Sequence, residues 1–515
     1  MAAFLFLLIP LAVNPFGQDP YLIKTVLSVA LISAAAAQTL FQRKKLYAGN
    51  LSPVLVIFVL STFLSLTAAS NIDVALLKLS ATTPLLLLYF FLDSSARNKA
   101  LNFTAYAVII VCAVGIIQKT TFLLSGSAGA FSGRIYSTLG NPNFLASFLL
   151  ISFPFFASWA DKKNHGSLAL LPYACILLTQ TAGSILSLLV ILGLFFARDR
   201  KKAKLSFPGV LFPVHLLIII CALFLFGLSS KKMSVQERLF KWRSGIEIVK
   251  ENPLLGVGWG GVKTNFALYQ QRVKRDFALK STSESKIHND YIQIAAESGI
   301  IGFLAYGALL FSALAFLRKN NFYAFAGLTA FMLDSVTNFP VELPASLMLL
   351  ALILSFDGEK NNVKISKAVP ATASDNAILH MALAIVCLFF LFISVKDFVA
   401  DISRKKGYDS YAVNDFKNAE SSWLLAHRLS PTSGKTAYAL GMLYINTKRY
   451  PEAINMFKKS IKIRNYGEVY NNLGNAFYLN DNNAEALPAW EKAVELGCPG
   501  KENIQKNINS LKKEP

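Results

Sequence analysis

Residues 286–317 read KIHNDYIQIAAESGIIGFLAYGALLFSALAFL. The second half, residues 300–317, carries no charged side chain. At about 1.5 Å per residue in a helix, it is long enough to cross most of a hydrocarbon core of about 30 Å. The first half is polar and places His288, Asn289 and Asp290 together. The stretch therefore predicts a membrane helix that carries groups suited to chemistry at one of its ends.

The rest of the chain repeats this pattern of apolar blocks separated by short polar connections. Of its 515 residues, 54% are hydrophobic and only 16% are charged, whereas soluble domains average nearer a quarter charged. We predict an all-α, polytopic membrane protein with about 12–14 spans. The predicted segments lie near 2–13, 21–40, 51–68, 74–92, 102–124, 143–160, 167–179, 183–197, 208–228, 290–317, 322–337, 344–357 and 377–398.

Two of these segments, 167–179 and 183–197, are too short to cross a bilayer alone. Between them lies TQTAG, residues 179–183. Two half-length helices that meet at such a turn leave irregular backbone at membrane depth, which is tolerated only inside a protein cavity. The alternative is one long tilted helix with a kink.

Basic residues set the predicted orientation, because Lys and Arg collect in cytoplasmic loops. The basic short loops are 41–50, 93–101, 161–166, 198–205, 318–320 and 358–367, and they all fall on one side. The short loops on the other side carry only Arg134. The N-terminus is then cytoplasmic, and residues 229–289 and 400–515 lie outside. This assignment also explains the net charge of +21 without nucleic-acid binding, and we expect no nucleic-acid partner.

The C-terminal tail shows a repeat of 33–34 residues that is built from a glycine, an alanine and an aromatic residue. Its members are Gly407, Ala419 and Trp423, then Gly441, Ala453 and Phe457, then Gly474, Ala486 and Trp490. The pattern resembles the tetratricopeptide repeat. Three stacked helix pairs would form a concave surface for a protein partner, or would only cap the membrane domain.

We accordingly divide the chain into four parts. These are N-terminal membrane helices (1–228), a large periplasmic loop (229–289), C-terminal membrane helices (290–400) and a periplasmic repeat domain (401–515).

Four motifs outside the repeats carry a second resemblance. They are Gly140-Asn-Pro-Asn143, Arg238-x-x-x-Trp242, PLLGVG at 253–258, and HNDYIQIAAESGIIG at 288–302. Together they resemble the O-antigen ligase and polymerase family, over roughly residues 1–400.

The resemblance implies a multispan, GT-C-like glycosyltransferase of the bacterial inner membrane that works without a metal or other cofactor. Its donor would be a glycan on undecaprenyl diphosphate. Its acceptor would be a hydroxyl of a lipid A core, of another glycan chain or of a protein. Membrane lipids would be its surroundings, and the motifs do not separate a ligase from a polymerase.

The residue types in the large outer loop suit that reaction. A diphosphate leaving group is an anion, and without a metal Arg and Lys must neutralise it, Arg in a bidentate manner. Arg238 holds the Arg-x-x-x-Trp position and is the first candidate; Arg243 is a second, and a purely structural ion pair is the alternative role for Arg238. His288 lies at the mouth of a span, where an imidazole can accept a proton from an attacking hydroxyl. Asn289 or Asp290 would cap the helix that follows.

Four further residues are candidates for binding substrate, each with a structural alternative. Arg134 could contact glycan or phosphate. Asn141 and Asn143 lie at the start of a span, and we expect Asn143 to be its N-cap. Lys78 lies one turn into a span, and it would snorkel to the surface or hold lipid phosphate.

Two features depart from a simple assignment. The family often carries an Arg in the turn between the two short helices, and here Ala182 stands in its place. Either Arg134, Arg243 or Lys78 substitutes for it, or the chemistry is altered. The glycines at 256–261 fail the nucleotide-binding patterns, so we expect them to let the loop fold tightly against the membrane domain.

Two other functions stay open. A transporter should show paired inverted repeats and ionisable groups near mid-membrane, and only one pair of short segments is present. A non-catalytic scaffold that gathers partners through its repeats is the other possibility, and the missing turn Arg favours it.

Overall fold

The computed structural model describes residues 2–19, 21–42, 46–127, 129–202, 206–226, 232–274, 286–358, 373–431, 433–463 and 466–512. Within these ranges every regular element is a helix. The α-helices are α1 (Leu5–Leu11), α2 (Leu22–Phe41), α3 (Ser52–Leu64), α4 (Ile72–Leu87), α5 (Ser94–Ser125), α6 (Pro142–Lys162), α7 (Leu170–Leu178), α8 (Ala182–Lys202), α9 (Phe207–Phe226), α10 (Lys232–Glu251), α11 (Val262–Lys274), α12 (Asp290–Asn320), α13 (Phe322–Thr337), α14 (Pro344–Leu354), α15 (Ala373–Ala412), α16 (Phe416–Leu429), α17 (Gly434–Asn446), α18 (Tyr450–Ile461), α19 (Gly467–Leu479), α20 (Asn483–Glu495) and α21 (Lys501–Leu511).

The apolar segments predicted from the sequence are helical in the structure. Within the described ranges, seven helices are long and apolar enough to cross a membrane, and six shorter apolar helices accompany them. Each of these coincides with one of the thirteen segments predicted above, so the prediction of a polytopic helical membrane protein is confirmed.

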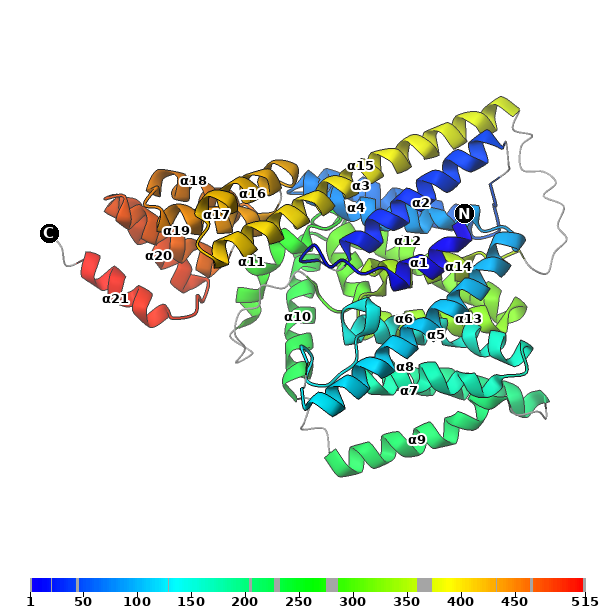
Figure 1. Ribbon diagram of the computed structural model, residues 1–515. Coiled ribbons are helices and arrows are strands. Elements are labelled where there is room, and N and C mark those ends of the chain that lie inside the picture. Colours follow the sequence, from blue (N-terminus) through cyan, green and yellow to red (C-terminus); the bar gives the residue numbers. More distant parts are fainter. Residues whose placement is uncertain are drawn as a thin grey trace.

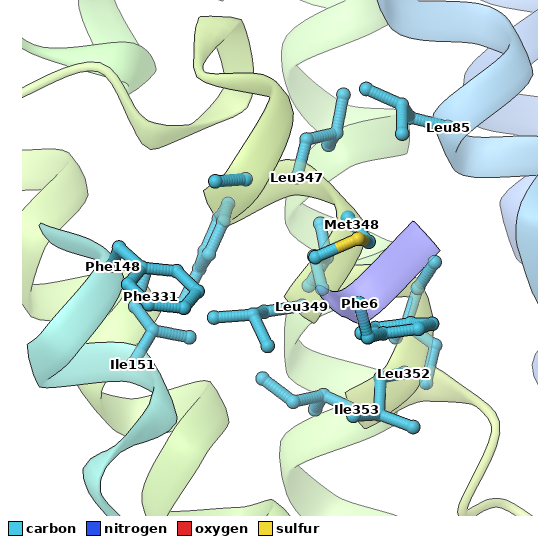
Figure 2. Packing of buried hydrophobic residues seen from close by; sticks show 14 of the residues in the cluster. Phe6, Leu85, Phe148, Ile151, Phe331, Leu347, Met348, Leu349, Leu352 and Ile353 are labelled. Atoms are coloured by element: carbon cyan, nitrogen blue, oxygen red, sulfur yellow. The ribbon is translucent and has the colours of Figure 1, made fainter. Parts of the chain in front are cut away.

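The centre of the bundle is α14, a helix that is apolar on every side. All eleven of its residues are buried, as expected for a helix that has no polar face to turn outward. It packs against α1, α4, α6 and α13, and Figure 2 shows Leu347, Met348 and Leu349 surrounded by Phe6, Phe148 and other apolar side chains of these helices.

The predicted turn between two short helices is present, but only one of the helices is short. α7 has nine residues, whereas α8 has 21 and reaches Lys202. Gln180 adopts a left-handed backbone in the turn between them (φ 53°). The expectation for 183–197 was therefore wrong in length, because the helix continues past its apolar block through basic residues whose long side chains reach the surface.

The glycine-rich loop 253–261 packs into a kink in α12. Val257 N–H donates to the Ala296 carbonyl (2.9 Å), and Ile300 N–H donates to the Pro253 carbonyl (2.8 Å). A Cβ on Gly256 (φ 66°) would lie 2.5 Å from the Ala296 oxygen, so only glycine allows this approach. The structure thus gives these glycines the packing role that the sequence indicated.

The C-terminal part forms stacked helix pairs, and the repeat glycines make room for the repeat aromatics. A Cβ on Gly407, Gly441 or Gly474 would clash with Trp423, Phe457 or Trp490, respectively. The first helix of the first repeat is the end of α15, which runs 40 residues from the membrane segment without a break.

α10, α11 and the repeats α16–α21 lie together at one end of the bundle, at the left of Figure 1. The C-terminal end of α2 and the N-terminal end of α15 lie at the opposite end. α10, α11 and the repeats therefore share one end of the bundle.

Candidate active site

The arrangement begins with α10, whose Arg238 and Trp242 lie one turn apart on the same face. The Trp242 indole N–H donates to the backbone carbonyl of His288 (3.3 Å). α10 therefore places the Arg-x-x-x-Trp motif beside the segment that carries His288.

In the triplet His288-Asn289-Asp290 the histidine is partly exposed, whereas Asn289 and Asp290 are buried and form the start of α12. Asn289 is the N-cap of α12, since its side-chain oxygen accepts from Ile292 N–H (3.0 Å). Asp290 is buried and accepts from the Ser335 hydroxyl and from a backbone N–H (3.1 Å each). Capping by Asn289, one of the two residues expected, is thus confirmed.

His288 itself is held in an unusual backbone conformation beside an aromatic ring. Its φ is 58°, a region that few residues other than glycine adopt. The imidazole lies edge-to-face against Phe339, with ring centroids 5.0 Å apart. Such a strained residue is maintained by its surroundings, here by the Trp242 hydrogen bond and the cap that follows.

Arg134 reaches the turn between α7 and α8 from a separate loop. Its guanidinium donates to the Thr179 carbonyl (2.7 Å), the Thr181 hydroxyl (3.2 Å) and the Asn143 side-chain oxygen (2.9 Å). This is the turn in which Ala182 stands where the family often has an arginine. Of the substitutes considered above, Arg134 is therefore the one whose guanidinium lies at the turn.

Arg134 and Arg238 act on each other electrostatically. Burial lowers the pKa of Arg134, and the neighbouring charge of Arg238 lowers it further. Burial also lowers the pKa of Arg238, while Asp334 opposes that shift. Within the described part of the chain, Arg238 makes no hydrogen bond or ion pair. The charge of Arg238 thus disfavours the charge of Arg134, and an anion bound between the two would relieve this repulsion.

The carboxylate that acts on Arg238 is itself hydrogen-bonded. Asp334 is fully buried and accepts from the hydroxyls of Ser147 (2.5 Å) and Ser184 (3.1 Å). Since those serines belong to α6 and α8, Asp334 also ties α6 and α8, the helix that follows the turn, to α13.

Lys78 belongs to a buried ion-pair network. Its ammonium pairs with Glu297 (2.5 Å) and with Glu342, and it lies 4.8 Å from the centre of the Trp259 ring. Lys286 pairs with the same Glu342. Of the two roles expected for Lys78, snorkelling to the surface was therefore wrong, because two carboxylates within the fold hold its charge.

The other predicted substrate-binding residues have the following places. Asn141 is the N-cap of α6, and its side chain accepts from Asn143 N–H (2.8 Å). The expectation that Asn143 is the cap was wrong, since its side chain binds Arg134 instead. Arg243 is exposed on α10. Substrate contact by these three residues stays a prediction.

Sequence reasoning missed Lys286 and Phe339. The Lys286 ammonium lies 5.4 Å from the centre of the Phe339 ring, the same ring that His288 contacts. Its place two residues before the histidine was the available signal for Lys286, whereas Phe339 had none. No cluster of three or more His, Cys, Asp or Glu side chains suited to a metal occurs among the described residues.

Comparisons with known proteins agree with the motifs. Residues 167–307 match the family described as O-antigen ligase, and residues 434–466 and 468–498 match two families described as tetratricopeptide repeat. The chain is 28% identical over 159 residues to the exopolysaccharide production protein ExoQ of Rhizobium meliloti (strain 1021). That alignment covers 29% of this chain and 37% of the relative, so it spans little more than a third of the relative's length. Both resemblances stated from the motifs are confirmed.

Proposed function

With an O-antigen ligase domain at its centre, we propose that this protein transfers a glycan from undecaprenyl diphosphate to an acceptor hydroxyl at the outer face of the bacterial inner membrane. The N-terminus would be cytoplasmic and the repeats periplasmic. The observations that support the proposal most are that Arg134 lies at the turn between α7 and α8, that the charge of Arg238 lowers the pKa of Arg134, and that Arg238 has no ion-pair partner in the described chain.

The chemistry requires charge neutralisation at the leaving group. As the acceptor oxygen bonds to the anomeric carbon, the bond from that carbon to the diphosphate oxygen breaks, and the diphosphate departs with the electron pair. Arg238 and Arg134 would bind its oxygens, and each charge-assisted hydrogen bond stabilises by about 1.5–3 kcal/mol. No metal is needed in this scheme.

His288 would act as the general base. Its imidazole takes the proton of the acceptor hydroxyl as the oxygen attacks, so the nucleophile does not accumulate positive charge. The Trp242 hydrogen bond and the Asn289 cap hold the histidine where α10 presents Arg238. Because Arg238 lies one turn before Trp242 on α10, base and cation would serve the same transfer step.

A ligase and a polymerase would share this donor site and differ in acceptor. Deleting the gene and separating the cell's polysaccharides by gel and mass spectrometry distinguishes them. Single repeat units on the final acceptor indicate a lost polymerase, and long chains left on the carrier indicate a lost ligase. Complementation with His288→Ala should fail although the variant inserts in the membrane. An unchanged polysaccharide profile after deletion would refute the proposal and favour a transporter or a scaffold.

A further inference from the structure

A stripe of exposed apolar side chains runs along α10. Val235, Leu239 and Ile246 are 54%, 45% and 42% exposed. At about 100° per residue, these three positions fall within an arc of about 40° on the helix surface. The opposite side of the helix is packed against protein, and Phe240 and Ile248 are buried there. One face of α10 is therefore covered by the fold, and an apolar face is left uncovered.

The exposed face also carries cationic side chains. Arg243 is exposed and lies on the same side of the helix as the apolar stripe. Lys250 is exposed on that side too, but its ammonium pairs with the Glu247 carboxylate (2.6 Å), which balances its charge. A helix that combines a narrow apolar face with basic residues and many other polar side chains is typical of helices that lie in a membrane interface.

The position of α10 in the chain keeps its start close to the membrane. The span α9 ends at Phe226 and α10 begins at Lys232. The five residues between them can bridge at most about 20 Å when fully extended. In Figure 1, α10 runs across the end of the bundle, whereas α2 and α15 run along it. α10 therefore has the direction of a helix that lies in the membrane surface.

We propose that the stripe of Val235, Leu239 and Ile246, with Arg243, lies in the outer leaflet of the phospholipid bilayer, at the boundary between headgroups and acyl chains. α10 would then be an interfacial helix, with the apolar side chains in the acyl region and the Arg243 guanidinium at the lipid phosphates.

The size of the stripe favours a lipid surface over a protein partner. A stable protein interface buries about 800 Å² on each partner. Three half-exposed side chains on one helix supply far less than that, and they form a line, whereas an interface needs a patch. A bilayer requires no minimum area, because the hydrocarbon already begins at the neighbouring span. The lipid surface is thus the occupant that fits both the narrow shape and the place of the stripe.

The proposal has a consequence for Arg238, which rests on the proposed transfer function. Trp242 and Arg238 lie about 40° and 80° from the middle of the stripe, both on the same side of it. Both are partly exposed, so they lie where the lipid-facing side of α10 meets the protein-facing side. Tryptophan is enriched at that level of a membrane. The stripe would therefore hold Arg238 at the depth at which the carrier's diphosphate lies.

Spin labelling of the full chain in nanodiscs tests the depth of the stripe directly. Leu239→Cys and Ile246→Cys, each in a background without the five native cysteines, are labelled with a nitroxide. Collisions with oxygen, which concentrates in hydrocarbon, are compared with collisions with a water-soluble nickel chelate. Both labels are expected about 5–10 Å below the headgroup surface. This measurement does not depend on glycan transfer, so it stands or fails apart from the proposed function.

Two further positions give matched controls. Leu425 on α16 is 43% exposed, close to the exposure of Leu239, and its label should collide mainly with the nickel chelate. Leu217 on the span α9 is 60% exposed and should collide mainly with oxygen. Labels on the stripe that behave as the Leu425 label does would overturn the proposal. Labels shielded from both reagents would overturn it as well, because they would show that a protein surface or a second copy covers α10.

A kinetic experiment tests the consequence for Arg238. Leu239→Asn combined with Ile246→Asn should raise the KM for carrier-linked glycan about three- to tenfold, whereas Leu425→Asn should leave it unchanged. The rise in melting temperature on adding pyrophosphate should stay as in the wild type, because this soluble anion reaches Arg238 whatever the depth of the helix. An unchanged KM, or loss of the pyrophosphate effect, would contradict the link between the stripe and Arg238.

Discussion

The substitution Arg238→Ala tests whether Arg238 binds substrate or stabilises the fold. The guanidinium makes no hydrogen bond or ion pair within the described residues, is partly buried, and is repelled by Arg134. Removing it takes away a desolvated charge and its repulsion with Arg134, breaks no hydrogen bond or ion pair of the described fold, and loses the attraction of Asp334. Because these effects oppose one another, the melting temperature of the unliganded protein should change by no more than a few degrees.

The catalytic effect should be large by comparison. Losing one charge-assisted hydrogen bond of about 1.5–3 kcal/mol lowers kcat/KM about 10- to 150-fold, because every 1.4 kcal/mol is a factor of ten. Loss of a bidentate contact would lower it about 100-fold or more. Added pyrophosphate should raise the melting temperature of the wild type, and this shift should shrink in Arg238→Ala.

The assay uses protein in nanodiscs, carrier-linked glycan extracted from the host, and gel detection of the transferred product. Lys250→Ala is the matched control, since it removes an exposed cation from the same helix, one that pairs only with the neighbouring Glu247, and should change kcat/KM much less. The reasoning would be refuted by a variant that melts several degrees lower but whose folded fraction transfers glycan at the wild-type rate.

Three further predictions follow from contacts in the bundle. Arg134→Ala should inactivate the protein. Adding Ala182→Arg to that variant should restore measurable transfer, because the new guanidinium starts from the turn that Arg134 reaches. If the double variant transfers no more glycan than Arg134→Ala alone, Arg134 does not take the place of the turn arginine. Lys78→Met should lower the free energy of unfolding by about 3–5 kcal/mol by leaving buried carboxylates unpaired, and a second change, Glu297→Gln, should recover part of the loss in denaturant titration. Gly256→Ala should lower the free energy of unfolding by about 1–3 kcal/mol, because it strains the backbone and blocks the approach of the loop to α12. A variant as stable as the wild type would show that the loop 253–261 does not pack closely against α12.

The fold could be predicted because its signals are local. An apolar block indicates a membrane helix wherever it occurs, and a glycine 16 residues before an aromatic, as Gly441 precedes Phe457, indicates a repeat. The length of α8 could not be predicted in this way. Its last turn is basic, and a basic helix end has the same composition as a cytoplasmic loop.

The site could be predicted only as far as its parts are close in sequence. Arg238 and Trp242 share a turn of helix, and His288 opens the next span, so local motifs located them. The partners of Lys78 lie 219 and 264 residues away in Glu297 and Glu342. Nothing local distinguishes a lysine that pairs inside the bundle from one that snorkels, because the difference lies in which helices become neighbours.

The charged side chains inside the bundle have partners within the protein, and this favours a glycan-transfer reaction at one end of the bundle over transport of a solute through it. Buried Lys24 donates to the carbonyls of Ile9 (2.9 Å), Pro10 (3.1 Å) and Ala12 (2.6 Å), and the partly buried Lys78 pairs with two carboxylates. A transport path for a charged solute needs ionisable groups that exchange partners near mid-membrane. Lys24 and Lys78 are held by these partners, whereas Arg238, without a hydrogen-bond or ion-pair partner in the described chain, lies on α10, at the end of the bundle near the repeats (Figure 1). An anion would therefore be bound and released at that end, which is what a diphosphate leaving group requires.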